Sequence, residues 1–175
     1  MGAGVPIMQI ITCTNEHLHQ MLSILNEVIE HTTSNYDYEP KSEHELRQWL
    51  KEKQDGGYPV LGILDEYGFL AGFATYGPWR PKKGYRFTYE HSIYVAKEHR
   101  RKGYAKVLLS ELIEYARSSG GHCLLAVIDA DNSASIALHE GFGFSRCGHL
   151  REVGYKFDRY LDLVLYQMLL NAEKS

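Results

Sequence analysis

The chain has 175 residues, of which 44% are hydrophobic and 23% are charged. This length suits one domain with its own core, and the composition excludes disordered, collagen-like and disulfide-rich classes. The net charge of -3 creates no overall positive field, so we expect neither nucleic acid nor an anionic membrane surface as a partner.

The cysteines and the chain ends carry little functional signal. Cys13, Cys123 and Cys147 form no CxxC pair and no zinc-finger spacing, so we expect reduced core thiols. The N-terminus shows no signal-peptide pattern and the chain has no apolar run long enough for a membrane span, which favours a cytoplasmic protein. We expect residues 1–6 to be disordered or cloning-derived, residues 7–170 to form the domain, and residues 171–175 to be a tail.

The first half of the chain predicts a strand, two helices and a meander of strands. A short apolar run at 7–12 is followed by apolar residues at helical spacing from Leu18 to Ile29. Ser42 and Glu45 have the spacing of a capping box and open a second helix that should end at Gly56-Gly57. Strand-like runs then occupy residues 60–64, 69–76 and 87–95, with a hairpin loop at 65–68.

The second half predicts two helices and three strands. Apolar positions from Leu108 to Ala116 indicate a third helix. Residues 123–128 are uninterruptedly apolar, which is typical of a strand buried on both faces. Asn132 opens a fourth helix that ends near Gly141, and strands at 144–150 and 161–169 complete the order βααβββαβαββ. This order predicts a single α/β (α+β) domain.

The most specific motif is Val-Ala-Lys-Glu-His-Arg-Arg-Lys-Gly-Tyr-Ala at residues 95–105, where an apolar strand runs into a basic turn that opens a helix. Unpaired backbone N–H groups and the helix dipole make such a turn a site for a pyrophosphate. Gly103 lets the backbone approach a phosphate, and the small Ala105 avoids crowding it. Further positive charge would come from Arg101, Lys102 and Lys106. A helix start with solvated basic residues is the alternative.

Arg100-x-x-Gly103-x-Ala105 after a strand resembles the acetyl-CoA loop of the GNAT superfamily of acetyltransferases. Further stretches resemble its phosphinothricin and methionine sulfoximine acetyltransferase branch, at residues 77–80, 89–95, 131–144 and 154–156. The similarity runs from about Ile7 to Leu170. It implies a mixed, mostly antiparallel sheet of about six to seven strands with four flanking helices. This sheet would be splayed at a bulge in the strand before the loop, where acetyl-CoA binds.

The same resemblance implies the residues that bind the cofactor. The pantetheine arm would pair with the free backbone of Ile93, Tyr94 and Val95, as an added strand does. The phosphates would lie on Arg101, Lys102, Gly103, Tyr104, Ala105 and Lys106. Asn132 would hydrogen-bond the pantetheine arm with Ser135 nearby, whereas a role as N-cap alone is the alternative. No metal is expected.

Acetyl transfer to an amine requires a base, a donor for the thioester oxygen and a proton for the leaving thiolate. Glu90 is the candidate base. Strand alternation places it with Thr88, Ser92 and Tyr94 on a face that we expect to be a polar cavity, where partial desolvation raises a carboxyl pKa. A structural glutamate paired with Arg86 or another cation is the alternative. The oxyanion donor would be a backbone N–H between Ile93 and Val95.

His139 stands where many relatives in the wider superfamily have a tyrosine that protonates the thiolate, and the branch named above has histidine there. As an imidazolium His139 could donate this proton. The alternative is a satisfied helix histidine near Phe142.

Basic residues just ahead of Glu90 indicate an anionic substrate, because arginine binds carboxylate or phosphinate through bidentate hydrogen bonds. A solvated basic loop is the alternative. The candidate substrate-binding residues are Arg80, Lys82, Glu90, His91, Ser92 and Tyr155. We expect a homodimer that acetylates a small amine of the phosphinothricin, methionine sulfoximine or methionine sulfone type. The competing functions are acetylation of a protein N-terminus, a lysine or a polyamine, and noncatalytic sensing of acyl-CoA.

Overall fold

The computed structural model describes residues 7–171, so the expectations for residues 1–6 and 172–175 lie outside the described residues. The strands are β1 (Gln9–Thr12), β2 (Val60–Leu64), β3 (Leu70–Pro78), β4 (Thr88–Val95), β5 (Cys123–Asp129), β6 (Ser145–Lys156) and β7 (Arg159–Leu169). The helices are α1 (Leu18–His31), α2 (Glu43–Asp55), α3 (Tyr104–Ser118) and α4 (Ser133–Gly141), with 3-10 turns η1 (Asn15–His17), η2 (Lys83–Tyr85) and η3 (Lys97–His99).

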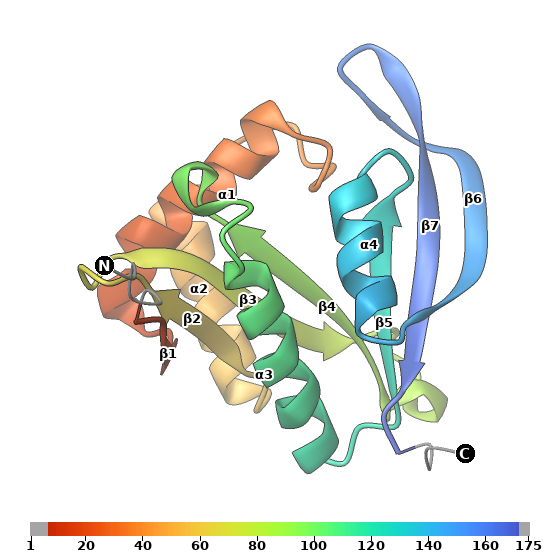
Figure 1. The fold of residues 1–175 in the computed structure, drawn as a ribbon, viewed down its shortest axis with the longest axis horizontal. Helices are drawn as coiled ribbons and strands as arrows, with labels where there is room; N and C mark the ends of the chain where they lie inside the picture. Colours follow the sequence, from red (N-terminus) through yellow and green to blue (C-terminus); the bar gives the residue numbers. More distant parts are fainter. Residues whose placement is uncertain (1–6, 172–175) are drawn as a thin grey trace, which may run out of the picture.

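All seven strands form one sheet in the order β1-β2-β3-β4-β5-β7-β6. Neighbouring strands are antiparallel except β4 and β5, which run parallel. The helices α1 and α2 cover one face, and α3 and α4 cover the other (Figure 1). This arrangement confirms the predicted mixed, mostly antiparallel sheet with four helices.

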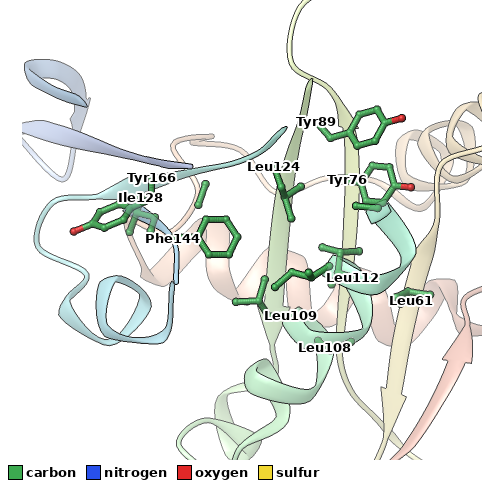
Figure 2. Close-up of a cluster of buried hydrophobic side chains, with 14 of the residues drawn as sticks. Leu61, Tyr76, Tyr89, Leu108, Leu109, Leu112, Leu124, Ile128, Phe144 and Tyr166 are labelled. Atoms are coloured by element: carbon green, nitrogen blue, oxygen red, sulfur yellow. The ribbon is translucent and has the colours of Figure 1, made fainter. Parts of the chain in front are cut away.

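Each face of the sheet has its own apolar core. On the α3 side, Leu108, Leu109 and Leu112 are fully buried and pack with Leu124 of β5 (Figure 2). Their spacing places them on one stripe of the helix, which is why the sequence pattern predicted α3. On the opposite face, α1 and α2 pack against Phe73 of β3.

Two local signals in the sequence produce the structures that they predict. The Ser42 hydroxyl accepts a hydrogen bond from the Glu45 amide at 3.2 Å, and the Glu45 carboxylate accepts one from the Ser42 amide at 2.7 Å, which completes the capping box of α2. In the β2–β3 loop the Asp65 carboxylate accepts from the amides of Tyr67 and Phe69, each at 2.9 Å. Gly68 supplies the positive φ of 82° that closes this turn.

The last two strands are longer than the predicted 144–150 and 161–169. β6 continues to Lys156, and the hairpin closes through Phe157 and Asp158, whose φ angles are 52° and 58°. Two-residue turns with positive φ usually contain glycine or asparagine, so Phe-Asp gives no turn signal. An irregularity between Leu150 and Gly154 also interrupts the strand alternation that would have indicated β6.

A buried lysine fixes this hairpin to the end of α1. The Lys156 ammonium, on a residue that is only 4% exposed, donates to the carbonyls of Ile29 (2.5 Å), Thr32 (2.9 Å) and Asn35 (2.7 Å). It therefore satisfies carbonyl groups that a helix C-terminus leaves free, and it adds positive charge where the helix dipole favours it. The connection holds the α1–α2 loop against the sheet.

The cysteine prediction needs a correction. Cys13 is buried and Cys123 is half-buried, but Cys147 is exposed on β6, so the three are not all core thiols. All three are free, as expected. None of the helices within residues 7–171 combines the length and the apolar character needed to cross a lipid bilayer.

Gly154 provides a test of how the hairpin holds the α1–α2 loop. A Cβ atom at Gly154 would lie 2.3 Å from Cε2 of Tyr36, whose hydroxyl donates to Asp129 at 2.8 Å. Gly154→Ala must therefore displace a hydrogen-bonded ring. We expect urea unfolding to show a loss of about 1–3 kcal/mol. Gly84→Ala, which has no atom within 4 Å of the added methyl, is the control. If Gly154→Ala and Gly84→Ala are equally stable, the hairpin does not hold the α1–α2 loop through this contact.

Candidate active site

The parallel strands β4 and β5 separate soon after they begin. They pair only at Thr88–Glu90 with Cys123–Leu125, and beyond these positions they diverge (Figure 1). A cavity of about 560 Å³ lies between residues 92–95 of β4 and 126–129 of β5. The predicted splay is therefore present. The predicted bulge is absent, because β4 keeps a continuous register with β3 from Gly72↔Val95 to Pro78↔Tyr89.

The loop from β4 to α3 forms one end of this cavity. Arg101 and Gly103 have φ angles of 62° and 89°, and the first main-chain bond of α3 runs from Val107 to the Gly103 carbonyl at 3.2 Å. The amides of Tyr104, Ala105 and Lys106 donate to no acceptor among the described residues. Free amides at a helix N-terminus bind anions, so this end of the cavity suits a phosphate.

Most of the predicted cofactor residues gather at this cavity. Those that line it are Ile93, Tyr94, Val95, Arg101, Gly103, Tyr104, Ala105, Lys106, Asn132 and Ser135. Lys102 is exposed and lies outside the lining. Arg100 also belongs to the wall, where its guanidinium donates to the Val95 carbonyl at 3.2 Å and pairs with Glu27 of α1.

Asn132 opens α4 on the opposite wall. Its side-chain oxygen accepts from the Ser135 amide at 3.1 Å, which is an N-cap, and its amide donates to the Ser34 hydroxyl at 3.3 Å. Asn132 thus connects α4 with the α1–α2 loop while it faces the cavity.

His91 and His139 form a largely buried pair in the wall of the cavity. Their Nε2 atoms are 2.8 Å apart, and the Nδ1 of His139 lies 2.7 Å from the Ser135 carbonyl, to which it must donate. Burial lowers the pKa of His139, and burial followed by the neighbouring ring lowers that of His91 to about 3. In the neutral pair, the Nε2–H of His91 therefore donates to the Nε2 of His139. Both nitrogens of His139 are engaged, and its aromatic neighbour is Phe144 rather than Phe142.

Glu90 lies on the opposite face of β4 from His91 and does not line the cavity. It is half-buried. Burial raises the pKa of its carboxyl, and the charge of Lys53 on α2 lowers it. Ser92, two residues further on the same face, lines the cavity, so Glu90 sits about 7 Å along the strand from its rim. Arg86, which the sequence analysis considered as an ion-pair partner of Glu90, instead donates to the Lys83 carbonyl at 3.3 Å and covers the Phe87 ring.

The predicted substrate residues are only partly brought together. His91 and Ser92 line the cavity, whereas Arg80, Lys82 and Tyr155 are exposed outside it. The Arg80 guanidinium lies 5.2 Å from the Trp79 ring centroid, and the Tyr155 ring packs on Tyr160 at 5.0 Å.

Sequence reasoning missed the α1–α2 loop as a wall of the cavity. Thr32 and Ser34 line the cavity. Asn35 donates to the Tyr94 hydroxyl at 3.4 Å, and Tyr36 donates to Asp129 of β5 at 2.8 Å. These contacts join positions far apart in the chain, and no motif marks them. Within residues 7–171, no group of three or more His, Cys, Asp or Glu side chains is placed to hold a metal ion.

The neutral burial of His91 should make the fold acid-sensitive. Its folded pKa of about 3 lies below the ordinary 6.5, so the unfolded chain takes up a proton first as the pH falls, and stability is lost progressively below 6.5. His91→Gln removes this titration and keeps a donor toward His139. Between roughly pH 6 and 4, we expect its free energy of unfolding to fall less steeply than that of the wild type, by about 1.4 kcal/mol per pH unit. If the free energies of unfolding of the variant and the wild type, measured in urea, fall in parallel as the pH is lowered, the His91–His139 pair is not neutral in the folded protein.

Residues 19–144 match the Acetyltransferase (GNAT) family. The L-methionine sulfoximine/L-methionine sulfone acetyltransferase of Pseudomonas aeruginosa is 40% identical over 155 residues, which are 89% of this chain and 90% of that protein. A GNAT superfamily phosphinothricin acetyltransferase from Sinorhizobium meliloti, solved in complex with AcCoA, has a TM-score of 0.90 and 32% identity, covering 94% of this chain and 88% of that one.

A third similar structure is a ribosomal-protein-alanine N-acetyltransferase from Brucella melitensis, with a TM-score of 0.90 and 41% identity over 92% of this chain and 99% of that one. The names of these relatives agree on the reaction type and differ in the amine. Together with the splayed sheet, they confirm the resemblance seen in the sequence. The chain belongs to the GNAT family of acetyltransferases.

Proposed function

We propose that this enzyme transfers the acetyl group of acetyl-CoA to the amine of a small, anionic, amino-acid-like compound. The observation that carries the proposal is the cavity itself, where the open edge of β4 meets the free amides of α3, with Glu90 one pleat away on the same strand. The relatives named for methionine sulfoximine and phosphinothricin support this substrate class.

The residues around the cavity suit acetyl-CoA. An extended pantetheine arm would lie along Ile93–Val95, because strand addition needs an unpaired backbone edge. The pyrophosphate would lie on the amides of 104–106, with the charges of Arg101, Lys102 and Lys106 around it. Asn132 and Ser135 would face the arm from α4. When bound, acetyl-CoA supplies the activated acetyl group.

The protein's own contribution is to move protons and place donors. Glu90 would take the proton of the substrate ammonium, directly or through water, so that the nitrogen can attack. A backbone N–H between Ile93 and Val95 would stabilise the oxyanion. His139 could supply the proton for the thiolate only as an imidazolium. Its Nε2 contact with His91 would have to open, and this nitrogen would first take up the proton that the amine nitrogen loses after its attack.

Two features favour a small anionic amine over a peptide or a polyamine. The α1–α2 loop is hydrogen-bonded to Asn132, Tyr94 and Asp129 and forms part of the cavity wall, so it would leave less room for a peptide than for a small amine. Arg80 and Lys82, on the exposed loop before β4, would attract an anionic group and repel a polycation. The Brucella relative keeps acetylation of a protein N-terminus as the second candidate.

A cytoplasmic homodimer is part of the same proposal. The free state of all three cysteines supports a reducing compartment. The β6–β7 hairpin exposes apolar side chains that a second copy would cover, namely Leu150, Val153, Tyr155, Phe157 and Tyr160.

A panel of amines with acetyl-CoA tests the function. We expect thiol release with methionine sulfoximine, methionine sulfone and phosphinothricin, at kcat/KM values about tenfold or more above those for lysine, spermidine and an alanine-terminated peptide. Gly103→Val is the control for the site, because a β-branched residue is strained at a φ of 89° and should raise the KM for acetyl-CoA. A preference for the peptide would support the second candidate, and no release with any amine would indicate a sensor.

Glu90→Gln tests the base, because it keeps the side-chain shape and removes the carboxylate. We expect kcat/KM to fall by about 10² to 10⁴ near neutral pH, with acetyl-CoA binding intact. Higher pH should restore part of the rate, since the substrate amine then arrives deprotonated. A wild-type rate would contradict the role of Glu90. A raised KM with unchanged kcat would show that it only binds the ammonium.

A further inference from the structure

Lys53 of α2 reaches from its helix to the sheet and is held there by several contacts. Its ammonium donates to the Tyr76 carbonyl at 3.0 Å and lies 5.6 Å from the ring centroids of both Trp49 and Tyr58. Aromatic faces attract cations, and the half-buried stem limits the motion of the side chain. Lys53 therefore places one positive charge at a defined position above β3.

This position is directly opposite Glu90. Gly77 of β3 is the cross-strand partner of Glu90, and a Cβ atom built on Gly77 would lie 2.9 Å from the Lys53 ammonium nitrogen. Side chains of directly opposed residues lie on the same face of a sheet, about 5 Å apart at Cβ. The ammonium thus occupies the space of the side chain that Gly77 lacks, beside the carboxylate.

The two groups do not form a direct salt bridge, because no nitrogen–oxygen distance between them falls within 4.0 Å. The lysine acts on the carboxylate through space, and the oxygens of Glu90 remain free to accept a proton. Burial raises the pKa of Glu90 and Lys53 opposes this shift. Burial lowers the pKa of Lys53, and Glu90 in turn raises it.

Among the described residues, Lys53 is the charged group that acts on Glu90. The strand partners Gly77 and Leu125 are not ionisable. Tyr58 packs edge-on against Tyr76 and Tyr89, whose side chains lie on the His91 face of the sheet rather than beside Glu90. On the Glu90 face, Cys123 of β5 is the partner of Thr88, and burial raises the pKa of its thiol. The closest arginine in sequence, Arg86, is turned onto Phe87.

We propose that Lys53 is a positioning residue for acetyl transfer: its fixed charge keeps Glu90 ionised in a half-buried site and disfavours the protonated form of a substrate amine beside it. This inference rests on the proposed role of Glu90 as the base. A carboxylate in the same place without the lysine would be protonated over a wider pH range and would accept the substrate's proton only in more alkaline solution.

The test is the pH dependence of kcat/KM at saturating acetyl-CoA. In Lys53→Met the acid limb should move to higher pH by about 0.5 to 1 unit, which lowers the rate on the acid side about three- to tenfold and leaves the alkaline plateau nearly unchanged. Lys53→Arg keeps the charge and should restore the wild-type limb. Lys53→Gln keeps a donor for Tyr76 without the charge and should behave like Lys53→Met, which also covers the case in which Lys53→Met fails to fold.

Lys51→Met is the matched control, because Lys51 is on the same helix but is 72% exposed and pairs with Asp55 at 2.5 Å. Its acid limb should coincide with that of the wild type. The proposal is overturned if the acid limbs of Lys53→Met and Lys53→Gln stay at the wild-type pH. It is also overturned if the acid limb of Lys53→Arg moves as far as that of Lys53→Met. Glu90→Gln separates the two proposals. If the acid limb of Glu90→Gln coincides with that of the wild type, Glu90 is not the base. If Glu90→Gln loses the wild-type limb and rises only where the substrate amine deprotonates, but the limb does not move in Lys53→Gln, only the role of Lys53 fails.

Discussion

Because β4 and β5 stop sharing hydrogen bonds after Glu90 and Leu125, the centre of the sheet contains backbone that no neighbouring strand satisfies. Buried backbone groups without partners are costly, so the opening must be completed by polar groups of a ligand or of water. The N-terminus of α3, the start of α4 and the α1–α2 loop all converge on this opening. The same interruption that costs pairing therefore creates the place where an extended ligand can bind.

The alternation of β4 separates two kinds of titratable site. His91 points toward α4, where burial and its contact with His139 keep both rings neutral. Glu90, its neighbour in sequence, points toward α2, where Lys53 opposes the effect of burial. Adjacent residues thus have different electrostatic surroundings, because one faces an uncharged ring and the other faces a cation.

The β6–β7 hairpin determines how the cavity is closed. Lys156 bonds three carbonyls at and beyond the end of α1, and Gly154 leaves room for the Tyr36 ring. These contacts hold the loop that binds Asn132 and Asp129. Positive φ angles at Phe157 and Asp158 are unfavourable for residues with a Cβ atom.

Local sequence patterns determined the helices, most strands and the glycine turn before α3, because the α3 stripe, the Ser42 capping box and Gly103 depend on residues within a few positions. The family resemblance, rather than local spacing, placed Ile93–Val95, Asn132 and Ser135 in the cavity wall. Only the tertiary structure decided that β4 splays without a bulge, that His139 is engaged by His91, and that Lys53 lies beside Glu90. The contact of Lys156 with Ile29 joins residues 127 positions apart. No spacing rule encodes such pairs, because their distances are determined by how the helices pack on the completed sheet.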